Sequence, residues 1–215
     1  MAELITGIDP AAVRANLERV REQAGDEVRI LVATKYVPAV EMPALAEAGV
    51  TLVGENRAQD LIAKQDAHGE SFEWHFIGAL QSRKVSEIAP RVRLIHSVAS
   101  DSALRRMSPA AAPDARVLVQ VNVAGEERKA GIEPAALGDF IAGCPLPVVG
   151  LMTMPPFVTD AEASRPHFAR LAELASEHGL TELSMGTSQD WPVAVSEGAT
   201  IIRLGSVLLK GRNGA

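Results

Sequence analysis

Short apolar runs alternate with helix-like segments along most of the chain. Eight runs rich in Val, Ile and Leu predict strands at Arg29–Thr34, Thr51–Val53, Glu73–Phe76, Arg93–Ile95, Arg116–Val121, Val148–Leu151, Glu182–Leu183 and Thr200–Ile202. Runs that are continuously apolar are typical of parallel strands buried on both faces, and helical segments between them are typical of βα repeats. The pattern therefore predicts an α/β fold in which strands and helices alternate.

The predicted helices carry recognisable start and stop signals. A helix over residues 10–24 follows Asp9, a good N-cap residue, with Pro10 at its first position and Gly25 at its end. Residues 161–178 also place apolar side chains at helical spacing. These segments are long enough to cover strands from outside.

The spacing of the strands indicates how many units the fold contains. A polar side chain stands at or just after the end of each run: Lys35, Asn56, His75, His96, Asn122, Thr153, Ser184 and Arg203. Lys35 and Arg203 are 168 residues apart, so the seven intervals average 24 residues. Eight such units suit a compact (β/α)8 TIM barrel, although polar residues are also expected wherever a strand meets a loop. We expect one domain over residues 1–215, with the barrel at about 29–206.

Composition and charge limit the partners of the chain. Hydrophobic residues make up 47% of the 215 residues and charged residues 22%, as in ordinary globular proteins. The net charge of −6 argues against binding to nucleic acid or anionic membranes by bulk charge. The start lacks a signal-peptide pattern, and the longest uncharged run, Ile141–Val158, contains four prolines. We therefore expect no membrane span and a cytoplasmic location.

Cysteine and histidine usage predicts neither a disulfide nor a metal site. Cys144 is the single cysteine, so no internal disulfide can form. The five histidines are His68, His75, His96, His167 and His178, and they show no ligand spacing of the HxH or HExxH kind.

Lys35 is the first candidate for chemistry, because it follows the apolar run ILVAT. A lysine that such a strand carries into a barrel mouth would be partly desolvated, which lowers its pKa and frees its amine for Schiff-base formation. The more common alternative is a lysine that extends from a strand end into solvent.

The last two strands supply a candidate phosphate site. Ser184 and Gly186 follow the seventh run, and Gly205 and Ser206 follow Arg203 in the eighth. TIM barrels often bind phosphate in the loops after strands seven and eight, where glycine lets backbone N–H groups approach an anion. Two ordinary turns would give the same pattern. Together with Lys35, these segments indicate a phosphorylated carbonyl compound.

Three further side chains have two interpretations each. Arg203 could donate a hydrogen bond to a cofactor ring nitrogen and keep it unprotonated, or form a structural ion pair. His75 and His96 could be acid–base groups at the barrel rim, but histidines at such positions are more often structural hydrogen-bonding groups. Alternation along the first strand predicts that Tyr36 faces away from Lys35.

Eight segments in order from Ile30 to Ser206 resemble the pyridoxal-phosphate-binding homeostasis proteins of the YggS/PROSC type. The segments are ILVATKYVP, VGENRAQDL, WHFIGALQSRK, LIHSV, VNVAGEERKAGI, GLMTM, LSMGTSQDW and IIRLGS. Arg83 and Ala99 depart from the usual family pattern, but they lie outside the lysine and phosphate motifs.

The resemblance implies a single-domain barrel like the N-terminal domain of alanine racemase, with pyridoxal 5′-phosphate (PLP) held as a Schiff base on Lys35. It places Arg203 at the pyridine nitrogen and Asn56 near the ring. It assigns the phosphate to Ser184, Gly186, Gly205 and Ser206. It also implies a protein of intracellular PLP (vitamin B6) homeostasis that delivers PLP to apo-enzymes, without established catalysis. We expect a monomer.

Two other functions compete with this interpretation. A PLP-dependent amino-acid racemase or lyase would use the same cofactor, but racemisation needs a base on each face of it. Arg203 would also weaken PLP as an electron sink. A Schiff-base aldolase that acts on a sugar phosphate through Lys35 fits the bare site, but the eight colinear motifs argue against it. We therefore expect a PLP-binding protein with no catalytic residues.

Overall fold

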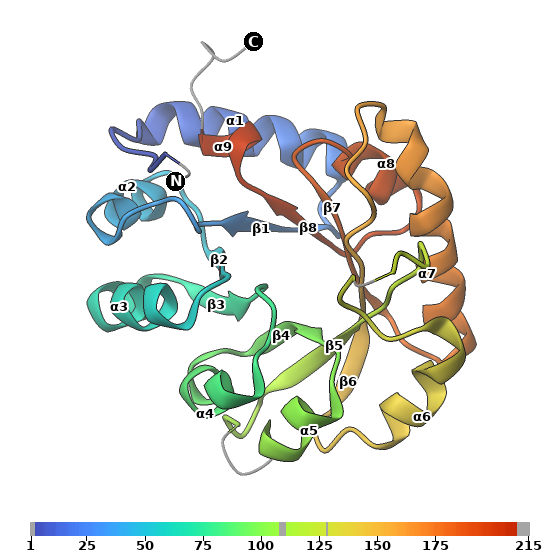
Figure 1. The fold of residues 1–215 in the computed structure, drawn as a ribbon. Coiled ribbons are helices and arrows are strands. Elements are labelled where there is room, and N and C mark those ends of the chain that lie inside the picture. Colours follow the sequence, from blue (N-terminus) through green and yellow to red (C-terminus); the bar gives the residue numbers. More distant parts are fainter. Residues whose placement is uncertain (1–2, 108–110, 128, 210–215) are drawn as a thin grey trace.

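The structure is a computed structural model that describes residues 3–107, 111–127 and 129–209, so both ends of the predicted 1–215 domain lie outside it. Eight parallel strands close into a barrel in sequence order (Figure 1). The strands are β1 (Arg29–Ala33), β2 (Leu52–Glu55), β3 (Glu73–Phe76), β4 (Leu94–Val98), β5 (Arg116–Gln120), β6 (Val148–Met152), β7 (Glu182–Thr187) and β8 (Ile201–Leu204). The predicted (β/α)8 barrel is thus confirmed.

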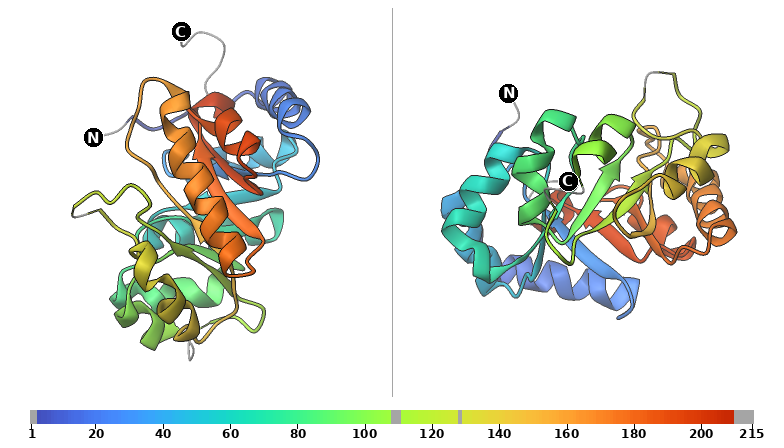
Figure 2. Two further views of the ribbon diagram at one scale, coloured as in Figure 1. Left: turned by 90° about the vertical axis from the view of Figure 1, so that its right-hand side faces the viewer. Right: turned by 90° about the horizontal axis from the view of Figure 1, so that it is seen from below.

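Helices surround this ring of strands on the outside (Figures 1 and 2). They are α1 (Pro10–Ala24), α2 (Met42–Glu47), α3 (Ala58–His68), α4 (Val85–Ile88), α5 (Asp101–Met107), α6 (Leu137–Ala142), α7 (Arg165–Glu177), α8 (Trp191–Ser196) and α9 (Ser206–Leu209). Among these described helices, none combines the length and the apolar character that crossing a bilayer requires.

Helix α1 begins and ends where the sequence predicts. The side chain of Asp9 accepts a hydrogen bond from the Ala11 N–H, and Gly25 terminates the helix with a positive φ of 83°. The helix packs beside α9, where the Asn16 side-chain amide donates to the Leu208 carbonyl at 3.0 Å (Figure 1). These contacts join the beginning of the described chain to its end.

Alternation along the strands divides the apolar residues into two groups. Side chains that face outward pack against the helices and form the larger core. A smaller group fills the barrel interior and comes from six strands: Leu31, Leu52, Leu94, Leu118, Met152 and Ile201. Inward positions that are polar must then find partners inside this apolar interior.

All eight predicted strands exist, but several of their ends were wrong. Strand β4 continues through His96 to Val98, β7 continues through Ser184 to Thr187, and β8 includes Arg203. The predictions stopped at these polar residues because polar side chains usually mark the end of a buried strand. Here the polar side chains face the inside of the barrel, so pairing continues past them.

Candidate functional site

A cavity of about 1150 Å³ opens at the carboxyl-terminal ends of the strands. Five predicted site residues line it: Lys35, Asn56, Arg203, Gly205 and Ser206. The sequence analysis did not select several others that also line it, including Tyr36, Ile77, Gly78, Met154, Thr187 and Ser188. Most predicted site residues therefore lie around one space, as expected for the catalytic face of a TIM barrel.

Lys35 is exposed, as in the more common of its two interpretations. Strand β1 ends at Ala33, so Lys35 lies in the turn that follows and its side chain is exposed at the cavity. Within the described ranges, the Lys35 amine makes no hydrogen bond or ion pair. The amine is therefore available to a ligand, and the strand does not bury it.

Tyr36 does not face away from Lys35. The Lys35 Nζ lies 5.0 Å from the centroid of the Tyr36 ring, and both side chains line the cavity. The prediction failed because it extended strand alternation into a turn, where successive side chains no longer point to opposite sides. Tyr36 is 37% exposed, so the cavity carries a phenol as well as an amine.

Arg203 forms part of the cavity floor, with most of its donors occupied. Its Nη1 donates to the Ser184 carbonyl at 2.6 Å and to the Ser184 hydroxyl at 2.7 Å. Its Nη2 donates to the Thr153 carbonyl at 2.9 Å and contacts the Met154 sulfur at 2.9 Å. A guanidinium has five N–H groups, and only the Nε–H of Arg203 has no partner among the described residues.

Burial lowers the pKa of Arg203 without removing its charge at neutral pH. Desolvation lowers its pKa to about 10, while the nearby Asp190 carboxylate acts in the opposite direction. The guanidinium still carries its charge at neutral pH. It therefore offers the cavity a charged donor and no acceptor.

Backbone donors converge at the start of α9. The Ser188 hydroxyl oxygen accepts from the Gly205 N–H at 3.2 Å and from the Val207 N–H at 3.4 Å. Both N–H groups thus point toward one oxygen position beside the cavity, and Ser206 lies next to them. Such an arrangement suits an anionic oxygen, which gains charge-assisted hydrogen bonds from backbone donors.

Ser184 and Gly186 do not line the cavity. Ser184 is fully buried beneath Arg203, and Gly186 adopts a φ of +89°. A Cβ on Gly186 would lie 2.6 Å from the Ala194 Cβ, so this glycine lets β7 pack closely against α8. The segment reaches the cavity instead through Thr187 and Ser188, and the assignment of Ser184 and Gly186 to a phosphate remains a prediction.

The side chain of Asn56 has an unpaired atom beside the cavity. Its amide oxygen is buried and has no hydrogen-bond partner in the part of the chain that the structure describes. Because an unpaired buried acceptor costs free energy, this oxygen is suited to accept a hydrogen bond from a ligand.

His75 and His96 are structural hydrogen-bonding groups, as the sequence analysis favoured. Both side chains are buried inside the barrel and hydrogen-bond to each other at 2.9 Å between His75 Nδ1 and His96 Nε2. His96 Nδ1 lies 2.8 Å from the Ser184 hydroxyl. Neither histidine is at the rim, and neither lines the cavity.

The sequence analysis missed that these residues form a connected network. Strict alternation could have shown that they face inward, because Glu73 and His75, then His96, Ser184 and Arg203, occupy alternate positions of their strands, but it could not have shown their connection.

Comparison with known proteins places this barrel in a family. Residues 8–213 match the family model for the N-terminal domain of alanine racemase. The pyridoxal phosphate homeostasis protein of Aquifex aeolicus is 39% identical, and the match covers 91% of this chain and 95% of that protein. The protein of the same name from Pseudomonas aeruginosa is 36% identical, with 94% of each chain covered.

Solved structures agree with this placement. PipY of Synechococcus elongatus with PLP bound superposes with a TM-score of 0.81 at 33% identity, over 92% of this chain and all of that one. Alanine racemase from Corynebacterium glutamicum has a TM-score of 0.72 at 16% identity and shows likeness of fold alone; the match covers 97% of this chain and 63% of the racemase. The chain belongs to the alanine racemase N-terminal domain family, and within it to the pyridoxal phosphate homeostasis proteins.

Proposed function

We propose that the chain binds PLP in this cavity, holds it as a Schiff base on Lys35 and serves PLP homeostasis. One observation carries the proposal. Among the described residues, a single cavity brings together a primary amine without a partner, one free N–H of a buried guanidinium and two backbone N–H groups that converge on the Ser188 hydroxyl. These three features match the aldehyde, the ring nitrogen and the phosphate of PLP. The structure of PipY with PLP bound supports the same ligand.

The unpaired atoms of the site also fit this ligand. When bound, PLP supplies two chemical groups. Its aldehyde condenses with an amine, and its aromatic ring can delocalise charge. The buried amide oxygen of Asn56 has no partner within the described chain and can accept a hydrogen bond from a hydroxyl of the ring.

Each group of residues has a defined part in holding the ligand. Arg203 would donate its Nε–H to the ring nitrogen, which must then be an unprotonated acceptor because a guanidinium cannot accept. Ser188, Gly205 and Ser206 would surround the phosphate with hydroxyl and backbone donors. Ser184 supports Arg203 from below.

The proposed function is storage or delivery of the cofactor without turnover. The relatives reported above are named for PLP homeostasis and not for a reaction. His75 and His96 bond to each other inside the barrel and cannot act as a second base in the cavity. The racemase or lyase alternative therefore gains no support from the histidines. Delivery to apo-enzymes, a monomeric state and a cytoplasmic location remain predictions.

Reduction with borohydride tests the covalent attachment. The PLP-treated protein should show a visible Schiff-base band, and borohydride should fix the cofactor on the peptide that contains Lys35. Lys35→Ala should remove both the band and the label. Lys84→Ala is the matched control, because Lys84 pairs with Glu87 away from the cavity and should leave both unchanged. Label on any of the four other lysines of the chain would overturn the assignment.

A further inference from the structure

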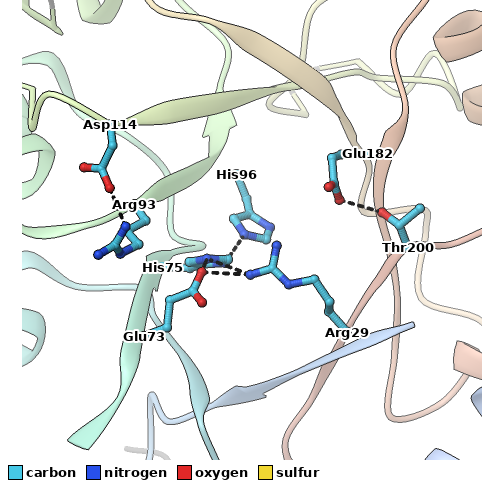
Figure 3. Close-up of polar contacts among 8 residues, drawn as sticks. All are labelled: Arg29, Glu73, His75, Arg93, His96, Asp114, Glu182 and Thr200. Atoms are coloured by element: carbon cyan, nitrogen blue, oxygen red, sulfur yellow. Dashed lines mark hydrogen bonds and ion pairs between the residues drawn. The ribbon is translucent and has the colours of Figure 1, made fainter. Parts of the chain in front are cut away.

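Five buried or half-buried side chains form a continuous row of hydrogen bonds through the barrel. From the cavity floor downward they are Arg203, Ser184, His96, His75 and Glu73. The separations are 2.7 Å from Arg203 to Ser184, 2.8 Å from Ser184 to His96, 2.9 Å between the histidines and 2.8 Å from His75 to Glu73. Figure 3 shows the lower part of this row, which ends where Arg29 pairs with Glu73 at 2.8 Å. We call the row the barrel relay.

The chemistry at its two ends gives the barrel relay one direction. Arg203 can only donate, so the Ser184 oxygen accepts from it, and the Ser184 hydroxyl proton is free to go to His96 Nδ1. His96 then carries its proton on Nε2 and donates to His75 Nδ1. His75 likewise donates from Nε2 to the Glu73 carboxylate, which can only accept. The four bonds of the row are then satisfied with both rings neutral, and the 3.5 Å contact of Arg29 Nη2 with His75 Nε2 is not a hydrogen bond in this arrangement.

The surroundings favour these neutral rings. Burial lowers the pKa of His96 well below its ordinary value, and His75, Arg203 and Arg29 lower it further. Burial also lowers the pKa of His75, with Arg29 and Arg116 acting in the same direction and Glu73 opposing them.

The upper end of the barrel relay determines how Arg203 presents itself. Both Nη1 hydrogens are directed to Ser184, and the Nη2 hydrogens are directed to Thr153 and Met154. Rotation of the guanidinium would break these bonds in a buried site, where unpaired groups are costly. The Nε–H is the donor that remains for a ligand.

We propose that Ser184, His96, His75 and Glu73 are positioning residues that fix Arg203 and thereby make the cavity select a ring with an unprotonated nitrogen. The inference deepens the proposed function and rests on it. The barrel relay does not conduct protons to the ligand, because that would require Arg203 to lose its proton, which guanidinium groups in proteins do not do. It acts through geometry and through the charge at each end.

The unliganded protein tests the direction of the barrel relay without any cofactor. Nitrogen-15 NMR of the full chain at neutral pH should show His75 and His96 as neutral rings protonated on Nε2. A through-hydrogen-bond coupling should join His96 Nε2 to His75 Nδ1. An imidazolium, or an Nδ1–H tautomer on either ring, would overturn the directional assignment.

Ring selectivity tests the positioning role. The probe pair is PLP and 1-deaza-PLP, in which a C–H replaces the ring nitrogen. The wild-type protein should prefer PLP by about 10- to 100-fold, the value of one charge-assisted hydrogen bond. Ser184→Ala should reduce this preference at least threefold. Glu73→Gln, at the far end, should reduce it as well, although Glu73 does not touch the cavity.

Glu182→Gln is the matched control for Glu73→Gln. Glu182 is also at the amino-terminal end of the barrel, but it accepts from Thr200 and is not part of the barrel relay (Figure 3). Its substitution should leave the preference unchanged. Unchanged preference in both Ser184→Ala and Glu73→Gln, with normal thermal melting, would overturn the positioning role.

The outcomes also separate this inference from the proposed function. If the wild-type protein forms no visible band with PLP, the proposed function is wrong and ring selection falls with it, while the NMR result still decides whether the barrel relay exists. If PLP binds but 1-deaza-PLP binds equally well, Arg203 does not contact the ring nitrogen, and the positioning role is overturned together with that contact, while PLP binding on Lys35 stands.

Discussion

The two ends of the barrel contain similar kinds of side chains in opposite states. At the amino-terminal end two arginines are paired with carboxylates, Arg29 with Glu73 and Arg93 with Asp114 (Figure 3). At the carboxyl-terminal end the Lys35 amine and the Arg203 Nε–H have no partner within the described residues. A smaller cavity of about 450 Å³ at the amino-terminal end is lined by the paired Arg93 and Asp114 and by Arg116, which is exposed and has no partner among the described residues. A buried donor without a partner, and not charge or hollowness alone, therefore distinguishes the ligand site.

The barrel relay connects these two ends. Its lower end anchors the Glu73 carboxylate between His75 and Arg29, and its upper end directs Arg203. Because each buried group depends on the next for its hydrogen bond, loss of an inner member leaves a polar atom unpaired on each side of it. Three predictions test this comparison between the two ends of the barrel.

The largest effect is expected from cutting the barrel relay at its middle. His96→Leu leaves the Ser184 hydroxyl and His75 Nδ1 unpaired in an apolar interior. The free energy of unfolding should fall by about 2–4 kcal/mol, since each buried unpaired group costs roughly 1–3 kcal/mol. Denaturant unfolding measures this loss.

The exposed ion pair of Arg93 with Asp114, at the amino-terminal end of the barrel, provides the control. Asp114→Asn breaks the bond to Arg93, but both side chains are more than half exposed, so the loss should stay below about 1 kcal/mol. Equal losses in the two variants would contradict the importance that we assign to burial.

The sequence could predict the barrel because its determinants are local. The eight apolar runs and the helix-capping signals at Asp9 and Gly25 depend on neighbouring residues only. The positions of Lys35 and Tyr36 could not be predicted, because β1 pairs only as far as Ala33 and a turn then sets their directions. Where a strand stops depends on its neighbours in the sheet, which the sequence does not place.

The relay residues were visible in the sequence but not their connection. His75 and His96 were singled out, and structural hydrogen bonding was the favoured interpretation, which the structure confirms. Ser184, the partner of His96, is on a strand that is distant in sequence. Glu73, the partner of His75, was interpreted only as the first residue of a strand. Only closure of the barrel brings these side chains together.

The second prediction concerns how the free energy of unfolding depends on pH. His75 and His96 have lowered pKa values in the folded state, so the unfolded chain binds more protons as the pH falls through about 6.5. The free energy of unfolding should therefore decrease with falling pH, by up to about 1.4 kcal/mol per pH unit for each histidine. A second loss should begin below pH 4.5, because the hydrogen bond from His75 holds the pKa of Glu73 below its ordinary value.

Denaturant unfolding at a series of pH values measures both slopes. His96→Leu should lower the slope below pH 6.5, because one of the two titrating groups is gone. An unchanged slope in this variant, or stability that rises as the pH falls from 7 to 5.5, would show that the histidines are not held neutral.

The smallest expected effect concerns turnover at the unpaired end. Tyr36 shares the cavity with Lys35, so the protein has one phenol that could be considered as a base. Its ring lies beside the lysine, however. The two barrel histidines hydrogen-bond to each other beneath the cavity and do not line it, so neither supplies an imidazole base there. The donor character of Arg203 also disfavours a protonated ring nitrogen, which weakens carbanion stabilisation.

The PLP-loaded protein should therefore exchange the α-proton of L-alanine in D2O far more slowly than ordinary enzymes, which turn over at about 1–10³ s⁻¹. Tyr36→Phe should leave the slow rate within about twofold, whereas a functional base contributes roughly 10²–10⁴-fold. Fast exchange with inversion that Tyr36→Phe abolishes would establish a racemase at this end of the barrel and overturn the carrier function.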